Sequence, residues 1–216
     1  RVKGMAARLD ADGATLLVDA DASLFPRYTF DAGRHVVPLA QTIGAQFLDC
    51  DLTLSRWNGQ TQGDHAFSVA QHSLIVETIF SRLNPAAAAD ELLMALLHDA
   101  PEYVIGDMIS PFKSVVGGGY KSVEKRLEAA IHLRFGLAPH PGRELKDRIK
   151  KADTVAAFFE ATELAGFSLS EAQKFFGLPR GITRDMIEIS PVPAIDAQGR
   201  FIARFEAIEQ LRKDLR

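Results

Sequence analysis

Apolar residues recur at helical spacing through most of the chain beyond residue 50. Over residues 67–83 they return every three or four positions, which predicts an amphipathic helix with His72 on its buried stripe. Asn84 and Pro85 are typical of an N-cap and of the first helical position, so a second helix is expected over residues 86–97. Further helices are predicted over residues 121–133, 144–164, 170–176 and 201–211.

The breaks between these segments complete the outline of the fold. Pro101 should end or bend the second helix, and the three glycines at residues 117–119 predict a flexible loop. Residues 1–27 mix Gly, Asp and Ala with one short apolar run, so a loosely attached arm or a small strand is expected there. No alternating strand pattern of useful length appears after residue 50. The sequence therefore predicts an all-α fold, a single-domain helical bundle over residues 28–216 behind a short irregular N-terminal arm.

Composition excludes several classes of protein. Hydrophobic residues make up 47% of the chain, which is the level of an ordinary globular domain. No apolar run approaches the roughly 18 residues of a membrane span, and the first residues lack the apolar core of a signal peptide. We therefore expect no membrane association and a cytoplasmic location. The single cysteine, Cys50, cannot form an internal disulfide and is interpreted as a small buried apolar residue.

Charge is distributed unevenly along the chain. The net charge of −3 disfavours binding to a nucleic-acid duplex. Residues 113–151, however, carry ten Lys or Arg against four acids. A positive field in this segment could attract a small anionic substrate, although the solvated faces of helices would explain the same composition.

Two acids and a histidine lie at positions that the predicted helices would bury. The apolar run at residues 92–97 should enter the core, and it ends directly in His98 and Asp99. Asp153 shares an apolar helical face with Ile149. A buried carboxylate needs a cation, a hydrogen-bond donor or the solvent of a cleft. Both aspartates are therefore candidates for a site.

His72 and His98 should meet across the predicted pair of helices. Each lies 12 or 13 residues from the turn that joins the helices. At about 1.5 Å of rise per residue, two antiparallel helices bring both imidazoles to the same height, roughly 18 Å from the turn. A third helix then offers Asp153. The expected metal ligands are His72, His98, Asp99 and Asp153.

Two imidazoles and two carboxylates make a mixed nitrogen and oxygen donor set. Such a set suits a divalent transition metal ion, Mn, Co, Fe, Ni or Zn, and the lack of thiolates argues against a closed structural zinc site. Taken singly, His72 could be a hydrogen-bonded core histidine, and Asp153 a cap or an ion-pair partner of Lys150 or Lys151. The joint pattern favours a metal site with open positions for water and substrate.

At these residues the sequence resembles the HD-domain phosphohydrolases, especially the bacterial branch that includes the 5'-deoxynucleotidases. A His, then a His-Asp pair, then a distant Asp is that family's order of metal ligands. The resemblance covers residues 56–164, about half of the chain. The matching stretches are SVAQHS at residues 68–73, HDAPE at 98–102, GD at 106–107, PFK at 111–113 and KAD at 151–153. The resemblance implies a bundle of HD-domain type.

The resemblance also implies roles around the ligands. Glu102 and Asp107 match groups that orient or deprotonate the attacking water in the deoxynucleotidase branch. Arg56 and Lys113 are the implied phosphate-binding residues. Arg56 with Trp57 stands in a place similar to an Arg-Trp pair that helps to read the nucleotide, although the loop after it is longer or differently aligned here. Three further histidines are interpreted as surface or capping residues: His65, His132 and His140.

The expected activity is hydrolysis of a phosphate ester by a metal-activated water. The expected partner is a small anionic nucleotide, a (deoxy)nucleoside 5'-monophosphate. One alternative is another HD activity, hydrolysis of a nucleoside triphosphate or an alarmone. Another is a metal- or nucleotide-binding regulatory module without turnover. Glu102 and Asp107 favour the enzyme, because a binding module needs no water-orienting acid. The oligomeric state, including a homodimer, is left open.

Overall fold

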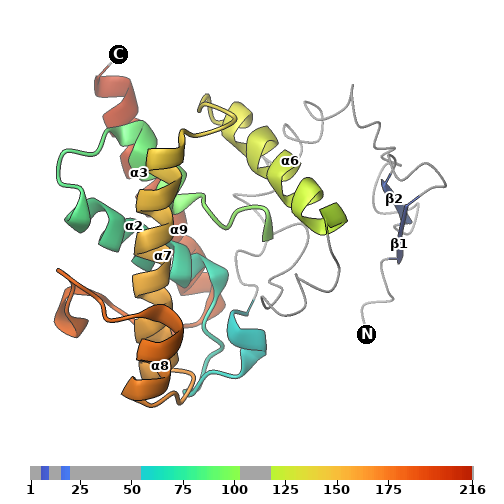
Figure 1. Ribbon diagram of the computed structural model, residues 1–216. Coiled ribbons are helices and arrows are strands. Elements are labelled where there is room, and N and C mark those ends of the chain that lie inside the picture. Colours follow the sequence, from blue (N-terminus) through green and yellow to red (C-terminus); the bar gives the residue numbers. More distant parts are fainter. Residues whose placement is uncertain (1–5, 10–15, 20–54, 103–117, 216) are drawn as a thin grey trace.

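The computed structural model describes residues 6–9, 16–19, 55–102 and 118–215 (Figure 1). Near the N-terminus, strand β1 (Ala6–Leu9) pairs antiparallel with strand β2 (Leu16–Asp19). A small strand was one of the two expectations for this arm, and the apolar run of residues 16–18 lies in β2. The other elements in the described residues are helices, so the all-α expectation is confirmed there apart from this hairpin.

Six α-helices and two short 3₁₀ helices make up the described helical part. The α-helices are α2 (Val69–Leu83), α3 (Ala89–Leu96), α6 (Gly118–Arg134), α7 (Arg143–Glu163), α8 (Leu169–Phe176) and α9 (Ala194–Asp214), and the 3₁₀ helices are η1 (Trp57–Gly59) and η2 (Arg184–Met186). Each helix predicted from the apolar spacing has a counterpart among them. None of the described helices is long and apolar enough to cross a membrane.

Helix α2 begins and ends with side-chain caps. Ser68 is its N-cap, and the Ser68 hydroxyl accepts a hydrogen bond from the backbone N–H of Gln71 at 3.2 Å. Asn84 ends the helix, since its side-chain amide donates to the carbonyl of Phe80 at 2.8 Å. The prediction that Asn84 caps the following helix is therefore wrong. Helix α3 begins after Ala88, whose backbone N–H donates to the Glu91 carboxylate at 3.2 Å.

Two other boundaries differ from the predicted ones. Helix α6 already includes Gly118 and Gly119, so the predicted glycine loop is wrong for these two residues, while Gly117 lies outside the described range. Helix α9 begins at Ala194 rather than at residue 201, directly after Pro193, whose φ of −49° suits the entry to a helix. Buried positions along α9 recur at three- or four-residue spacing from its first turn: Ala197, Phe201, Phe205, Ile208 and Arg212.

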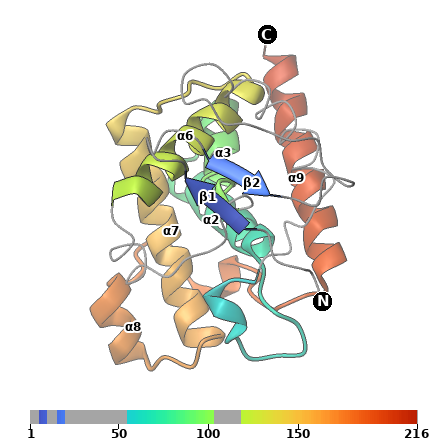
Figure 2. The same ribbon diagram turned by 90° about the vertical axis from the view of Figure 1, so that its right-hand side faces the viewer.

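Helix α2 lies at the centre of the bundle. It packs against α3, α7 and α9, while α3 also packs against α9 and α7 against α8. Figure 2 shows α7 and α9 on opposite sides with α2 and α3 between them. The core includes Phe67, Phe80 and Phe201, which are fully buried and have ≤1% of their surface exposed. Because α2 contacts three helices, its buried residues can meet side chains from several parts of the sequence.

A buried ion pair joins α2 to α9. The Glu77 side chain is 3% exposed, and Arg204 donates two hydrogen bonds to its carboxylate, Nε at 2.9 Å and Nη2 at 2.6 Å. Arg212 forms a second link, from α9 to the first turn of α3, through its 2.6 Å contact with Asp90. A buried carboxylate is costly without such donors, so Arg204 is the partner that makes Glu77 tolerable in the core.

Candidate metal centre

Two imidazoles meet beside the central helix. His72 lies on α2 and is fully buried, and its Nε2 atom is 3.2 Å from Nε2 of His98. Helix α3 ends at Leu96, so His98 and Asp99 stand in the turn that follows it. The expectation that the two histidines meet across this pair of helices is confirmed.

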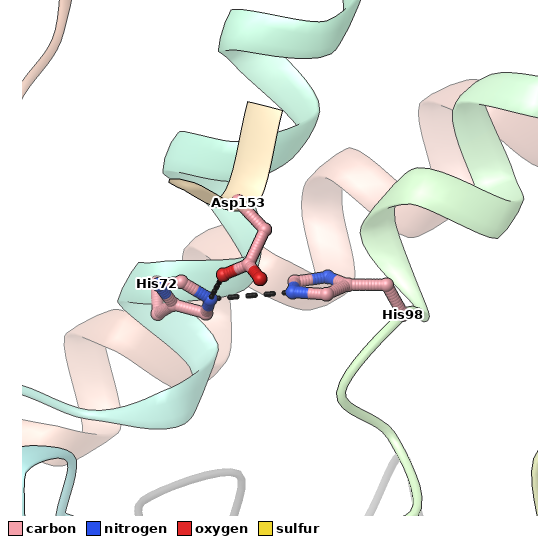
Figure 3. A group of neighbouring side chains, drawn as sticks. All are labelled: His72, His98 and Asp153. Carbon is pink, nitrogen blue, oxygen red and sulfur yellow. Dashed lines mark hydrogen bonds and ion pairs between the residues drawn. The ribbon is translucent and has the colours of Figure 1, made fainter. Parts of the chain in front are cut away.

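A carboxylate from α7 completes the group. Asp153 Oδ1 lies 3.3 Å from His72 Nε2. Figure 3 shows the side chains of His72, His98 and Asp153 pointing toward one another from three parts of the chain. One ligand atom from each lies within 4.8 Å of the other two, and these three residues could hold a metal ion. They are three of the four predicted ligands.

Asp99, the fourth predicted ligand, lies against both imidazoles. Its Oδ2 atom is 3.3 Å from His72 Nε2 and 3.4 Å from His98 Nε2. It also receives a 3.1 Å hydrogen bond from Arg56 Nη1. Asp99 is thus part of the cluster, and its role as a ligand stays a prediction.

Hydrogen bonds orient both histidines. The Nδ1 atom of His98 lies 2.9 Å from the carbonyl oxygen of Ala95, and a carbonyl can only accept, so Nδ1 carries the proton. The Nδ1 atom of His72 lies 2.5 Å from Oε1 of Glu160, which likewise accepts. Each ring therefore turns its Nε2 atom toward the shared centre. This is the arrangement in which metal-binding histidines are usually held.

The guanidinium group of Arg56 lies within a group of four acids. Its Nη1 atom lies 3.1 Å from Asp99 and 3.8 Å from Glu102, its Nη2 atom 3.8 Å from Asp153, and its Nε atom 3.4 Å from Glu160. The Glu102 side chain is 4% exposed. The structure therefore places Arg56 and Glu102, both singled out from the sequence, beside the predicted ligands. Their functional roles stay predictions.

Two known proteins are similar to the chain over most of its length. One is an uncharacterized protein of Rhodobacter capsulatus, 48% identical over 155 residues, which are 72% of this chain and 79% of the relative. The other is the uncharacterized protein YfdR of Escherichia coli K12, 32% identical over 150 residues, 69% of this chain and 75% of the relative. This chain belongs to the YfdR family. Neither of these two YfdR-family proteins has a name that indicates an activity. No family model matches the chain.

In this YfdR-family protein, the pKa values reflect the surplus of acids. Burial raises the pKa of Glu160, but the charges of His72 and Arg56 and the hydrogen bonds to its oxygens lower it to about 2. Burial and the charge of Arg56 lower the pKa of His72, whereas Glu160 and hydrogen bonds to two aspartates raise it, and the result lies well above the usual value. Burial lowers the pKa of Arg56, yet four carboxylates raise it above its usual value. The site stabilises positive charge, as a cation requires.

Sequence reasoning missed Glu160. This side chain is fully buried on α7, seven residues after Asp153, which is two helical turns along the same face. The signal was present, because Glu160 interrupts the buried run from Val155 to Ala161 in the same way that Asp153 interrupts an apolar stripe. A buried acid in such a run needs hydrogen-bond donors, and His72 and Arg56 supply them here.

The other predicted residues fall in several places. Trp57 lies at the edge of the site, where its Nε1–H donates to Glu160 Oε2 at 2.9 Å. Lys150 donates to the second oxygen of Asp153, Oδ2, at 2.6 Å, so the ion-pair interpretation of Asp153 also holds. Asp107 and Lys113 lie outside the described residues.

The three additional histidines divide into two groups. His65 and His140 are exposed, as predicted. His132, predicted as a surface or capping residue, is buried with 2% of its surface exposed and lies in the last turn of α6, so the surface alternative is wrong for it. The chain turns back after α6, and the backbone N–H of Leu137 donates to the carbonyl of His132 at 2.8 Å, which encloses the end of the helix. Burial lowers the pKa of His132.

Proposed function

We propose that the chain is a metal-dependent phosphohydrolase of HD-domain type that acts on a small nucleotide, a (deoxy)nucleoside 5'-monophosphate. One observation carries this proposal. Ligand atoms of His72, His98 and Asp153 converge within 4.8 Å in a partly buried site, and Asp99 contacts both imidazoles. These are the residues whose order along the sequence resembles the HD-domain ligand pattern.

The donor set fits a divalent cation. Two imidazole nitrogens turn toward the centre because their Nδ1 atoms are engaged by Glu160 and the Ala95 carbonyl. Four carboxylates surround a single guanidinium, which leaves a surplus of negative charge beside the imidazoles. A divalent ion held by His72, His98 and Asp153, with Asp99 as the fourth expected ligand, would supply a Lewis acid and lower the pKa of a bound water.

The residues around the ligands have distinct tasks in this proposal. Arg56 offers a planar guanidinium at the site and would bind the phosphate of the substrate with charge-assisted hydrogen bonds. Glu102 would orient the attacking water and accept its proton on a carboxylate oxygen. Its Oε2 atom lies 3.8 Å from Arg56 Nη1, so the group that takes the proton stands next to the group that holds the phosphate. Asp107 and Lys113 would assist, by resemblance alone.

The substrate assignment rests on the resemblance and on the number of positively charged side chains assigned to phosphate binding. Arg56 and Lys113 suit one phosphate group, whereas a triphosphate or an alarmone would need further positive charges. Trp57, beside Arg56, offers an aromatic ring at the edge of the site for the nucleoside part. Nucleotide preference should therefore depend on the Arg56–Trp57 turn.

Metal analysis followed by a phosphate-release screen tests the proposal. The purified chain would be loaded separately with Mn²⁺, Co²⁺, Zn²⁺ and Mg²⁺ and offered nucleoside 5'-monophosphates, triphosphates and alarmone, with inorganic phosphate or pyrophosphate as the readout. We expect phosphate release from monophosphates with at least one transition metal. Activity confined to triphosphates or alarmone would refute the substrate and keep the metal centre. Metal binding without turnover of any compound would favour the regulatory module.

A further inference from the structure

Glu160 uses both of its carboxylate oxygens within the site. Oε1 accepts from His72 Nδ1 at 2.5 Å. Oε2 accepts from Trp57 Nε1 at 2.9 Å and from Arg56 Nε at 3.4 Å. The side chain is fully buried, and such a carboxylate is tolerated only where donors satisfy it. Donors from two separate segments therefore depend on one acid.

On one side, Glu160 decides which nitrogen of His72 carries the proton. Because a carboxylate only accepts, Nδ1 keeps its proton, so Nε2 is the nitrogen whose lone pair a metal ion would take at the centre shared with His98 and Asp153. The ring cannot rotate away without losing this short contact. Glu160 therefore fixes both the tautomer and the direction of the first predicted metal ligand.

On the other side, Glu160 anchors the turn that carries Arg56 and Trp57. Trp57 has a φ of 55°, a left-handed backbone conformation that residues other than glycine rarely adopt. The indole N–H bond to Glu160 is one contact that holds it there. Its ring also meets Phe167 and Phe176 edge-on, with centroids at 5.9 and 6.3 Å. The turn is thus fixed by an apolar clamp on the ring and by Glu160 on the indole nitrogen.

We propose that Glu160 is a positioning residue that couples the metal centre to the Arg56–Trp57 turn, so that a change at His72 reaches Trp57 through one carboxylate. This inference rests on the proposed metal centre. It goes beyond it by assigning a residue outside the ligand set to metal affinity and to the geometry of the substrate-binding turn at once.

The variant Glu160→Gln separates these functions from simple packing. The amide has the same size, but one of its two ends must donate. If the NH₂ group faces His72, the ring must carry its proton on Nε2 and loses the lone pair that faces the centre. If it faces Trp57, two N–H groups oppose each other. Either orientation breaks one half of the coupling.

Isothermal titration with Zn²⁺ measures the first half. We expect Glu160→Gln to bind Zn²⁺ about 10- to 100-fold more weakly than the unchanged chain, the usual effect of removing a residue that orients a ligand. Glu163→Gln is the matched control, because Glu163 lies on the same helix and is 42% exposed in an ion pair with Arg184. It should bind Zn²⁺ as the unchanged chain does. Equal affinities in all three proteins would overturn the inference.

Fluorescence measures the second half, and its decisive measurement uses the unchanged chain, so it does not depend on how well the variant folds. Trp57 is the single tryptophan of the chain, so its emission reports the turn directly. In the unchanged chain, Zn²⁺ should change Trp57 emission with the midpoint found by titration calorimetry, and Glu163→Gln should respond in the same way. Glu160→Gln, saturated with Zn²⁺, should lose the response. Emission of the unchanged chain that stays constant through saturation would overturn the coupling and leave the metal centre intact. Absence of binding of both Zn²⁺ and Co²⁺ to the unchanged chain would instead overturn the proposed function, and this inference with it.

Discussion

The Nε2 atoms of His72 and His98 lie 3.2 Å apart, although 26 residues separate the two histidines in the sequence. The first belongs to the central helix and the second to the turn after α3. Because other acceptors engage the Nδ1 atoms of both rings, one cation between the rings would satisfy both Nε2 lone pairs. This relationship makes the pair the natural starting point for tests of the metal centre.

Replacing His98 with Ala should remove metal binding and activity together. His98 supplies one of the three ligand atoms that converge within 4.8 Å, and loss of a ligand from so small a set leaves too few donors. Metal content after gel filtration and phosphate release would be measured on the same sample. His140→Ala is the control, since His140 is exposed and should be silent in both assays. Stoichiometric metal retained by His98→Ala would contradict the ligand assignment.

Replacing Glu102 with Gln should preserve the metal and abolish most of the activity. The carboxylate is buried beside Arg56, and the amide fills the same volume but cannot take up a proton. A positioned acid or base contributes roughly 10²- to 10⁴-fold, so turnover by the metal-loaded variant should fall by that factor. Unchanged turnover would make Glu102 a structural residue.

Replacing Arg56 with Met should weaken substrate binding without weakening metal binding. The guanidinium lies among four carboxylates, and its removal leaves the site more negative, which cannot lower the affinity for a divalent cation by electrostatics. Loss of charge-assisted bonds to phosphate should raise KM by about 10- to 100-fold. Steady-state kinetics and calorimetry would separate the two effects. Arg143→Met, at a side chain that is 94% exposed, is the control. Lost metal with unchanged KM would argue against phosphate binding by Arg56.

Replacing Arg204 with Met should destabilise the fold and leave the site chemistry intact. The change leaves the buried Glu77 carboxylate without its two strong donors. The expected loss is about 2–3 kcal/mol of unfolding free energy, at the lower end for a broken buried pair because water can reach the partly exposed Arg204 side. Urea unfolding measures it. Arg200→Met is the control. Arg200 lies on α9 like Arg204, but its partner Glu188 is exposed, so this change should cost less than about 1 kcal/mol. Similar losses in both variants would contradict the importance of burial.

Much of the helical organisation could be predicted because it depends on local spacing. Apolar positions three or four apart located α2, α7 and α8 to within a few residues, and the two histidines were placed at equal heights by counting from the turn between them. The starts of α6 and α9 were missed because glycines and prolines that usually break helices here lie at or before their first turns. Asn84 shows the same difficulty, because an Asn side chain can cap either the helix before it or the helix after it. In the structure its amide donates to the carbonyl of Phe80, so it caps the end of α2.

By itself the sequence determined the helices and the residues that could bind a metal, because periodicity and donor chemistry are local properties. The tertiary structure decided which donors meet and what holds them. Glu160 contacts His72, 88 residues away in the sequence, and Trp57, 103 residues away. Contacts at such sequence separations cannot be predicted from the spacing of residues along the chain. Arg56 reaches its four acids from outside every predicted helix. Such contacts follow from how α2 and α7 pack, and packing joins residues whose positions along the chain are unrelated.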